Sequence, residues 1–257
     1  MNRVTETATG WCPPGWARSL AVPRTVDVLR NLAAAARARA MGTITNVLTR
    51  HPVAALTFDD GPHPKYTPRL LKILETHQAR GTFFMVGEAA ARCPELVRRV
   101  AEAGHAIGNH SWDHSSFTSL RGRERRKQIR ACAQALAPYE LRLFRPPYGY
   151  QSLASRLDAL LLGYQVIGWS VNAEDWLKRD AHWMTERVES EIQPGSIVLF
   201  HDAIYRSEEK EPHYDRQEML EAVNRLLERH VNRVRFVTIP ELLRSGNPNR
   251  QNWFYRS

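Results

Sequence analysis

The sequence has few cysteines, and their spacing indicates neither a metal site nor a redox site. Three cysteines occur in 257 residues, Cys12, Cys93 and Cys132, and no pair has the CxxC spacing. An odd number without metal-ligand spacing argues against a disulfide scaffold and against a zinc finger. We expect these cysteines to be small buried hydrophobic residues in a reducing compartment.

Long apolar runs are also missing. The first 22 residues lack the apolar core of a signal peptide and include Pro13, Pro14 and Arg18. The longest apolar stretch, residues 160–169, is about half as long as a membrane-spanning helix needs to be. We therefore expect the chain to lie in the cytoplasm or at the inner face of the membrane.

Acidic residues are in the minority. Lys and Arg number 36 against 27 Asp and Glu, which gives a net charge of +9. Such a surface attracts anionic partners such as nucleic acid, anionic lipid or acidic glycan. Because the charge is spread without a Lys/Arg block, we favour a basic enzyme and expect no nucleic-acid partner. The sequence does not indicate an oligomeric state.

Residues 23–41 strongly favour a helix, because they are rich in alanine, begin with proline and carry several arginines. This helix could pack on the main domain, lie on anionic lipid as a basic amphipathic helix, or belong to a transit peptide. We assign residues 1–50 to an N-terminal extension, 51–245 to a single main domain and 246–257 to a C-terminal tail.

From residue 53 onwards, predicted strands alternate with helices. Helical patterns such as 68–79 and 217–230 fit between most of the strands, which we place at residues 53–58, 82–86, 105–109, 142–145, 164–170, 196–200 and 234–238. This alternation predicts an α/β fold of parallel strands joined by right-handed helical crossovers, as an open sheet or a closed barrel.

The unusual polar residues follow the ends of these strands. They are Asp59, Asp60, Asn109, His110, Arg145, Asp175, His201 and Asp202. In barrels and open α/β sheets, active sites are built at the carboxyl ends of the strands. The pattern therefore predicts an active site at this face.

Two histidines and two adjacent aspartates indicate a metal site. His110 and His114 are four residues apart, a spacing that in a helical turn or a tight loop aims both imidazoles at one point, although such a pair alone is a weak signal. A carboxylate with two histidines leaves positions open for water and substrate. One aspartate can bind the cation while its neighbour acts as general base. Because successive strand residues point to opposite sides, we expect Asp59 and Asp60 to divide these tasks.

Five ordered motifs resemble those of a known family. "TFDDGP", "HSWDH", "RPPYG", "EDW" and "IVLFHD" occur in the order and approximate spacing found in the polysaccharide deacetylases, the NodB homology or carbohydrate esterase family 4 domain. The resemblance covers roughly residues 50 to 245. It implies a distorted (β/α) barrel in which residues 51–245 form the catalytic domain, preceded by the N-terminal helical extension.

The resemblance implies roles for the first half of the site. Asp59 would be the catalytic base, and Arg145 would pair with it and keep it ionised. Asp60, His110 and His114 would bind a divalent metal, usually zinc, with cobalt or nickel as alternatives.

It also implies roles for the second half. Tyr148 would stabilise the tetrahedral oxyanion through its backbone N–H. His201 would be the general acid, and Asp175 would raise the pKa of its imidazole. Trp176 and Leu199 would line the pocket for the acetyl methyl group, and ordinary core packing is a second interpretation that does not exclude this role.

The implied activity is removal of the N-acetyl group from an amino sugar, with release of acetate. N-acetylglucosamine in an oligosaccharide or a lipid-linked glycan is the expected substrate. The chain departs from the family at Asn172, where members often carry an aspartate, and we expect altered tuning of His201. Two alternatives remain: an amide hydrolase of the same fold acting on a cyclic imide, ureide or formamide, and a non-catalytic glycan-binding protein.

Overall fold

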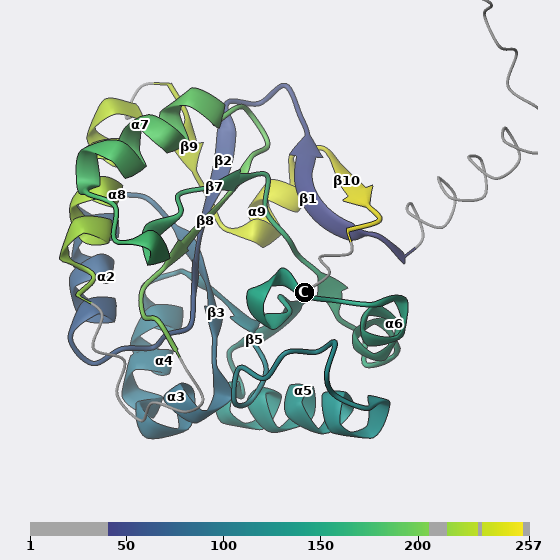
Figure 1. Cartoon of the computed structure of the whole chain (residues 1–257). Coiled ribbons are helices and arrows are strands. Elements are labelled where there is room, and N and C mark those ends of the chain that lie inside the picture. The colour runs from purple at the N-terminus through teal and green to yellow at the C-terminus, as the bar shows by residue number, and fades with distance from the viewer. Residues whose placement is uncertain (1–40, 206–214, 231–232, 254–257) are drawn as a thin grey trace, which may run out of the picture. The chain divides into compact units, whose positions relative to one another are not determined.

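The computed structural model describes residues 41–205, 215–230 and 233–253 (Figure 1). Residues 1–40 of the predicted N-terminal extension, and with them most of the helix predicted at 23–41, therefore lie outside the described residues. Within the described residues, no helix combines the length and the apolar character that a membrane span requires.

Parallel strands form the main sheet. Its order is β6-β5-β4-β3-β2-β8-β7, with β9 paired to β2. The strands are β2 (Val53–Asp59), β3 (Gly81–Met85), β4 (Ala106–Asn109), β5 (Glu140–Phe144), β6 (Gln165–Val166), β7 (Val171–Asn172), β8 (Ile197–His201) and β9 (Arg235–Phe236). The single strand predicted at 164–170 is wrong, because only β6 falls within this segment and pairs with β5, while β7 begins just after it and pairs with β8 at the opposite edge of the sheet.

Two further strands lie beside the main sheet. β1 (Thr43–Leu48) pairs antiparallel with β10 (Asn247–Gln251), and single bridges join Ile44 to Ile167 and Asn46 to Ser196. The parallel strands thus curl into a half-barrel with helices, which confirms the predicted distorted (β/α) barrel.

The folded unit is wider than predicted at both ends. β1 and β10 lie outside the predicted boundaries of 51 and 245, yet they pair with each other, and Ile44 and Val47 are buried in the same core as Val53. Short-range patterns could not reveal this pairing, because about 200 residues separate the two strands.

Helices cover the outside of the sheet (Figure 1). They are α2 (Tyr66–Thr76), α3 (Gly87–Arg92), α4 (Pro94–Glu102), α5 (Gly122–Leu136), α6 (Leu153–Leu161), α7 (Ala181–Glu191), α8 (Gln217–His230) and α9 (Ile239–Arg244), with 3-10 turns η1 (Pro147–Gly149) and η2 (Asp175–Leu177). Helix α8 has its predicted bounds. Helix α2 begins before Pro68, because proline is tolerated in the first turn of a helix.

The alternation along β2 decides which residues reach the inside of the barrel. Leu56 and Phe58 pack in the core cluster beneath the helices, whereas Val53 and Ala55 belong to the inner cluster. Side chains alternate between the faces of a strand, so Asp59 is in phase with the inner residues. The hydrophobic pattern of β2 therefore directs Asp59 into the barrel at its carboxyl end.

Candidate active site

The two adjacent aspartates point to the same side. Asp59 ends β2, while Asp60 has a φ of 75° and so leaves the strand. Asp59 Oδ2 lies 3.8 Å from His110 Nε2, and Asp60 Oδ1 lies 3.3 Å from the same atom. The expectation that the pair would point in opposite directions is therefore wrong. A left-handed residue costs conformational energy and is often found at functional sites.

The two histidines come from a tight loop after β4 and not from a helix. Ser111 and His114 have φ values of 69° and 61°, which turn the loop so that both imidazoles face Asp60. His114 Nε2 lies 3.2 Å from Asp60 Oδ1. The metal-binding atoms of Asp60, His110 and His114 all lie within 4.8 Å of one another, and all three residues are buried.

The chemistry of these three groups fits a divalent cation. His110 Nδ1 lies 2.8 Å from the carbonyl of Arg145, which can only accept, so the proton is on Nδ1 and Nε2 presents a lone pair. Asp60 Oδ2 accepts the N–H of Tyr205 at 2.9 Å, while Oδ1 is buried without a hydrogen-bond partner. Burial alone would raise the pKa of Asp60, but the imidazoles of His114 and His110 hold that pKa well below its usual range. One oxygen and two nitrogens suit zinc, and also cobalt or nickel.

Arg145 holds Asp59 in place. Its guanidinium is fully buried, donates to Asp59 Oδ1 at 2.7 Å and to Thr57 Oγ1 at 2.8 Å, and donates to the Gly168 carbonyl at 2.8 Å. The planar donors thus fix the position of the Asp59 carboxylate. Asp59 Oδ2 remains directed towards the metal-binding group.

His201 faces the base from the next strand. β2 and β8 are parallel neighbours, and Asp59 and His201 are register partners. Asp175 holds His201 through both carboxylate oxygens: Oδ1 lies 2.8 Å from Nδ1, and Oδ2 accepts the backbone N–H at 2.8 Å. Burial lowers the pKa of His201, but Asp175, with smaller contributions from Asp60 and Asp59, raises that pKa to about 9.

This pair predicts a change in the pH profile. If His201 is the general acid, activity requires its protonated form, which is present below its pKa and is lost as the pH rises through about 9. In Asp175→Asn the counter-charge is removed while burial remains, so we expect the alkaline limb of kcat to move down by more than one pH unit, roughly the effect of one nearby charge. Measuring kcat between pH 6 and about 10 tests this. An unchanged alkaline limb would contradict the assignment of His201.

Arg216 also belongs to this half of the site, although no sequence pattern indicated it. Its side chain is buried, and its Nη2 donates to the Asp175 carbonyl at 2.6 Å and lies 4.0 Å from Asp175 Oδ2. Arg216 thus holds Asp175 in place, and Asp175 in turn orients His201. Arg216 lies directly before α8 and belongs to none of the five motifs. It contacts Asp175 only because the chain folds the two residues together.

The remaining predicted residues surround the same centre. The ring of Tyr148 meets His114 edge-on at 4.5 Å, and that of Trp176 meets His201 edge-on at 5.3 Å. Tyr148 and Trp176 are 51% and 39% exposed, whereas Leu199 is buried in β8 beside Asn172 of β7. The structure therefore brings all ten predicted site residues to one region.

Asp202 is a further buried acid that the sequence placed at a strand end without a role. Thr67 donates to its carboxylate, and a side chain at Gly61 would overlap it, so the turn after the aspartate pair requires glycine. Burial raises the pKa of Asp202 to about 7, and the nearby charges of Asp60 and Asp59 add to this. Asp202 therefore supports the turn that carries Asp60.

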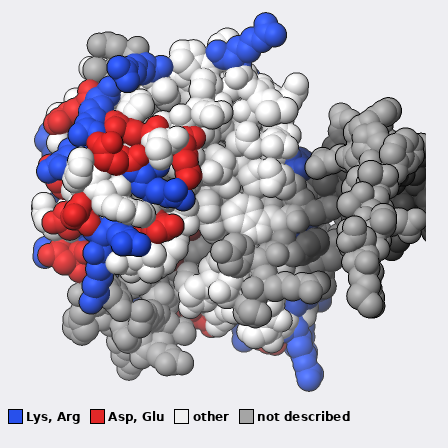
Figure 2. Space-filling model, turned by 45° about the horizontal axis from the view of Figure 1, so that its top comes forward, with Lys and Arg blue, Asp and Glu red and all other residues white. Residues whose placement is uncertain are grey.

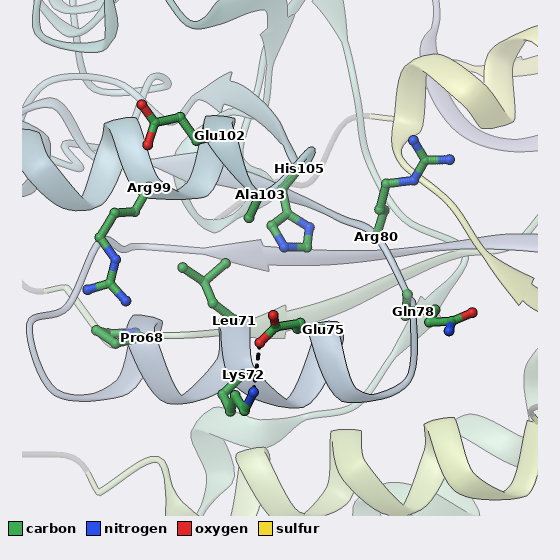
Figure 3. Close-up of a pocket in the computed structure, with 11 residues that line it drawn as sticks. Pro68, Leu71, Lys72, Glu75, Gln78, Arg80, Arg99, Glu102, Ala103 and His105 are labelled. Carbon is green, nitrogen blue, oxygen red and sulfur yellow. Dashed lines mark hydrogen bonds and ion pairs between the residues drawn. The ribbon is translucent and has the colours of Figure 1, made fainter.

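A separate cavity lies at the other end of the strands. It measures about 510 Å³ and lies between α2 and α4 near the starts of β3 and β4 (Figure 3). His105 reaches into it, and burial lowers the pKa of this histidine to about 4. None of the predicted site residues lines this cavity, so it is distinct from the candidate active site.

Comparisons with known proteins place the chain in a family. The model of the family described as polysaccharide deacetylase matches residues 46–167. A peptidoglycan-N-acetylglucosamine deacetylase of Bacillus cereus is 34% identical over 197 residues, which cover 75% of this chain and 68% of that protein. The chain belongs to the polysaccharide deacetylase family. This confirms the resemblance to carbohydrate esterase family 4, and with it the prediction of a hydrolase of this family.

Other relatives agree with this membership. A chitooligosaccharide deacetylase of Sinorhizobium fredii is 34% identical, over 62% of this chain and 76% of that protein. The crystal structure of the Bc1960 peptidoglycan N-acetylglucosamine deacetylase matches 85% of this chain and 100% of that chain, with 28% identity and a TM-score of 0.75. BA3943 of Bacillus anthracis, described as a CE4 family pseudoenzyme, matches 84% of this chain and 74% of that chain, with 23% identity and a TM-score of 0.71, and this likeness concerns the fold alone.

Proposed function

We propose that this deacetylase is a metal-dependent hydrolase that removes the N-acetyl group from an amino sugar and releases acetate. One observation carries the proposal: Asp59 and His201 are register partners on neighbouring strands beside the group formed by Asp60, His110 and His114. A base and an acid thereby stand on the two sides of a site that can hold a divalent cation.

When bound, the cation supplies Lewis acidity, which polarises a carbonyl and makes water more acidic. Asp59 accepts a proton from the attacking water through Oδ2, because Arg145 occupies Oδ1. The paired guanidinium stops the Asp59 carboxylate from rotating.

His201 donates a proton to the departing amine. Its Nδ1 is held by Asp175, so Nε2 is the nitrogen that can serve the substrate. The raised pKa, about 9, keeps the imidazole protonated at neutral pH. We assign the oxyanion to the backbone N–H of Tyr148, a donor that is commonly worth about 3 kcal/mol. Trp176 and Leu199 complete the pocket for the acetyl group.

We propose N-acetylglucosamine in an oligosaccharide or a lipid-linked glycan as the substrate. The names of the relatives from Bacillus cereus and Sinorhizobium fredii support this class. We place the chain in the cytoplasm or at the inner face of the membrane, where residues 23–41 would associate peripherally with lipid. The basic, alanine-rich composition of that segment supports the association.

A panel of substrates tests the proposed function. Metal-loaded protein should release acetate from chitooligosaccharides, peptidoglycan fragments or lipid-linked N-acetyl sugars, and a chelator should stop the release. Hydrolysis of small cyclic imides without acetate release from any glycan would instead favour the alternative amide hydrolase. Glycan binding without any hydrolysis by the metal-loaded protein would favour a non-catalytic role.

A further inference from the structure

The polarity of helix α6 is inverted. Three of its polar side chains are buried: Ser155, Arg156 and Asp158. Three leucines spaced four residues apart are exposed instead, by 38%, 37% and 79%: Leu153, Leu157 and Leu161. Residues four apart lie on one face of a helix, so these leucines form a continuous stripe, here named the leucine stripe. A surface helix normally shows the opposite arrangement.

Hydrogen bonds of the buried polar residues fix this orientation. Arg156 donates to the carbonyl of Trp253 at 2.8 Å and to that of Met41 at 3.2 Å. Asp158 accepts from Arg125 Nε at 2.7 Å. If α6 rotated to bury its leucines, Arg156 and Asp158 would lose these partners, which is costly for buried charges. The leucine stripe is therefore held outwards.

Helix α5 packs against α6 (Figure 1) and carries exposed positive charge. Its exposed basic residues are Arg121, which precedes the first turn, Arg123, Lys127 and Arg130. The side chains of these four residues, here named the basic face, form no ion pair with any described residue. Glu124 is the single exposed acid among them.

Exposed charges on α7 and α8 are paired with one another. Figure 2 shows Lys and Arg interleaved with Asp and Glu on one side of the molecule. On α7 and α8, Arg229 lies 2.7 Å from Glu186 and 2.8 Å from Glu189, and Arg225 lies 2.7 Å from Glu221. The basic face on α5 thus differs from α7 and α8, because its four basic residues cluster without acidic partners.

We propose that the leucine stripe and the basic face together form a docking surface for an anionic lipid bilayer. Leucines can enter the boundary between headgroups and acyl chains, while arginine and lysine neutralise anionic headgroups. A second copy of this chain is a poorer occupant, because a symmetric dimer through this surface would bring two basic faces together. The charge of the surface thus favours an anionic partner.

The docking surface begins beside the active site. Tyr148 lies in η1, five residues before the first leucine of the stripe, and its ring contacts His114 at 4.5 Å. A bilayer on this surface would therefore hold the mouth of the site close to the headgroups, where a lipid-linked glycan is presented.

Vesicle sedimentation with the full chain tests this inference. The protein should bind vesicles of phosphatidylcholine mixed with phosphatidylglycerol, bind poorly to phosphatidylcholine alone, and be released by high salt. Arg123→Gln/Lys127→Gln/Arg130→Gln should lower the partition coefficient about 100-fold, since each basic residue near an anionic surface contributes about a factor of five. Leu161→Gln should lower it about fivefold through lost apolar burial.

Matched variants elsewhere serve as controls. Leu48→Gln removes another exposed leucine, and Arg50→Gln/Arg99→Gln/Arg235→Gln removes the same charge from other elements. Equal losses in these controls, or no loss in the α5 and α6 variants, would overturn the inference. The inference would also be overturned if light scattering showed that the protein is a dimer and that Leu161→Gln dissociates this dimer. Acetate release from soluble chitooligosaccharides should be unchanged in all variants, which separates this result from failure of the proposed function.

Discussion

Asp59→Asn should lower kcat for deacetylation by at least about a thousandfold, within the range expected when a general base is removed. An amide cannot take the proton that the carboxylate takes. Its oxygen can still accept from Arg145 Nη1, so the geometry of the barrel end should persist. Bound metal should remain near the wild-type level, because the cation ligands are Asp60 and the two histidines.

Asp158→Asn is the matched control for this variant. Asp158 is also a buried aspartate paired with arginine, but it lies on α6, away from the metal-binding group. The Asp158→Asn variant should have a lower thermal stability than the wild type but the same kcat. Acetate release and metal content are measured together for both variants. If Asp59→Asn kept most of its activity, another group would have to be the base.

His110→Ala should lose both metal and activity. Only Asp60 and His114 would remain from the three-residue group, so metal affinity should fall by more than about 100-fold, beyond what the loss of an outer-shell partner costs. Metal content is measured by mass spectrometry after loading and desalting.

His105→Ala provides the comparison, since His105 is also buried but lies at the opposite end of the strands. It should retain metal and activity at some cost in stability, because the His105 imidazole accepts the N–H of Gly81. A His110→Ala protein that stayed loaded and inactive would show that His110 acts in chemistry and not in metal binding.

Much of the architecture followed from short-range patterns. The β2 pattern correctly placed Asp59 at the end of a buried strand, and the position of polar residues after strand ends correctly indicated one shared face. These predictions worked because the periodicity of two and the parallel arrangement are local and repetitive properties. The five motifs also indicated the polysaccharide deacetylase family, and the comparisons with known proteins confirm this membership.

Other features depended on contacts between distant parts of the chain. The chain changes partners after residue 167: β6 pairs with β5, whereas β7 pairs with β8, and β1, itself held by β10, forms single bridges to Ile167 and Ser196. Arg216 reaches Asp175 from 41 positions away. No local pattern encodes such contacts, since they are selected by packing in the complete core.

The sequence by itself determined which chemical groups the active site contains and at which end of the strands they gather. The tertiary structure decided how those groups meet. Asp60 turns to the same side as Asp59 because its backbone adopts a left-handed conformation, which the Gly61 turn and the buried Asp202 accommodate. The inverted polarity of α6 was likewise decided by the folded chain, where Met41, Trp253 and α5 supply the partners that hold its charges inside. A side chain's surroundings, and not its type alone, determine whether burying it is favourable.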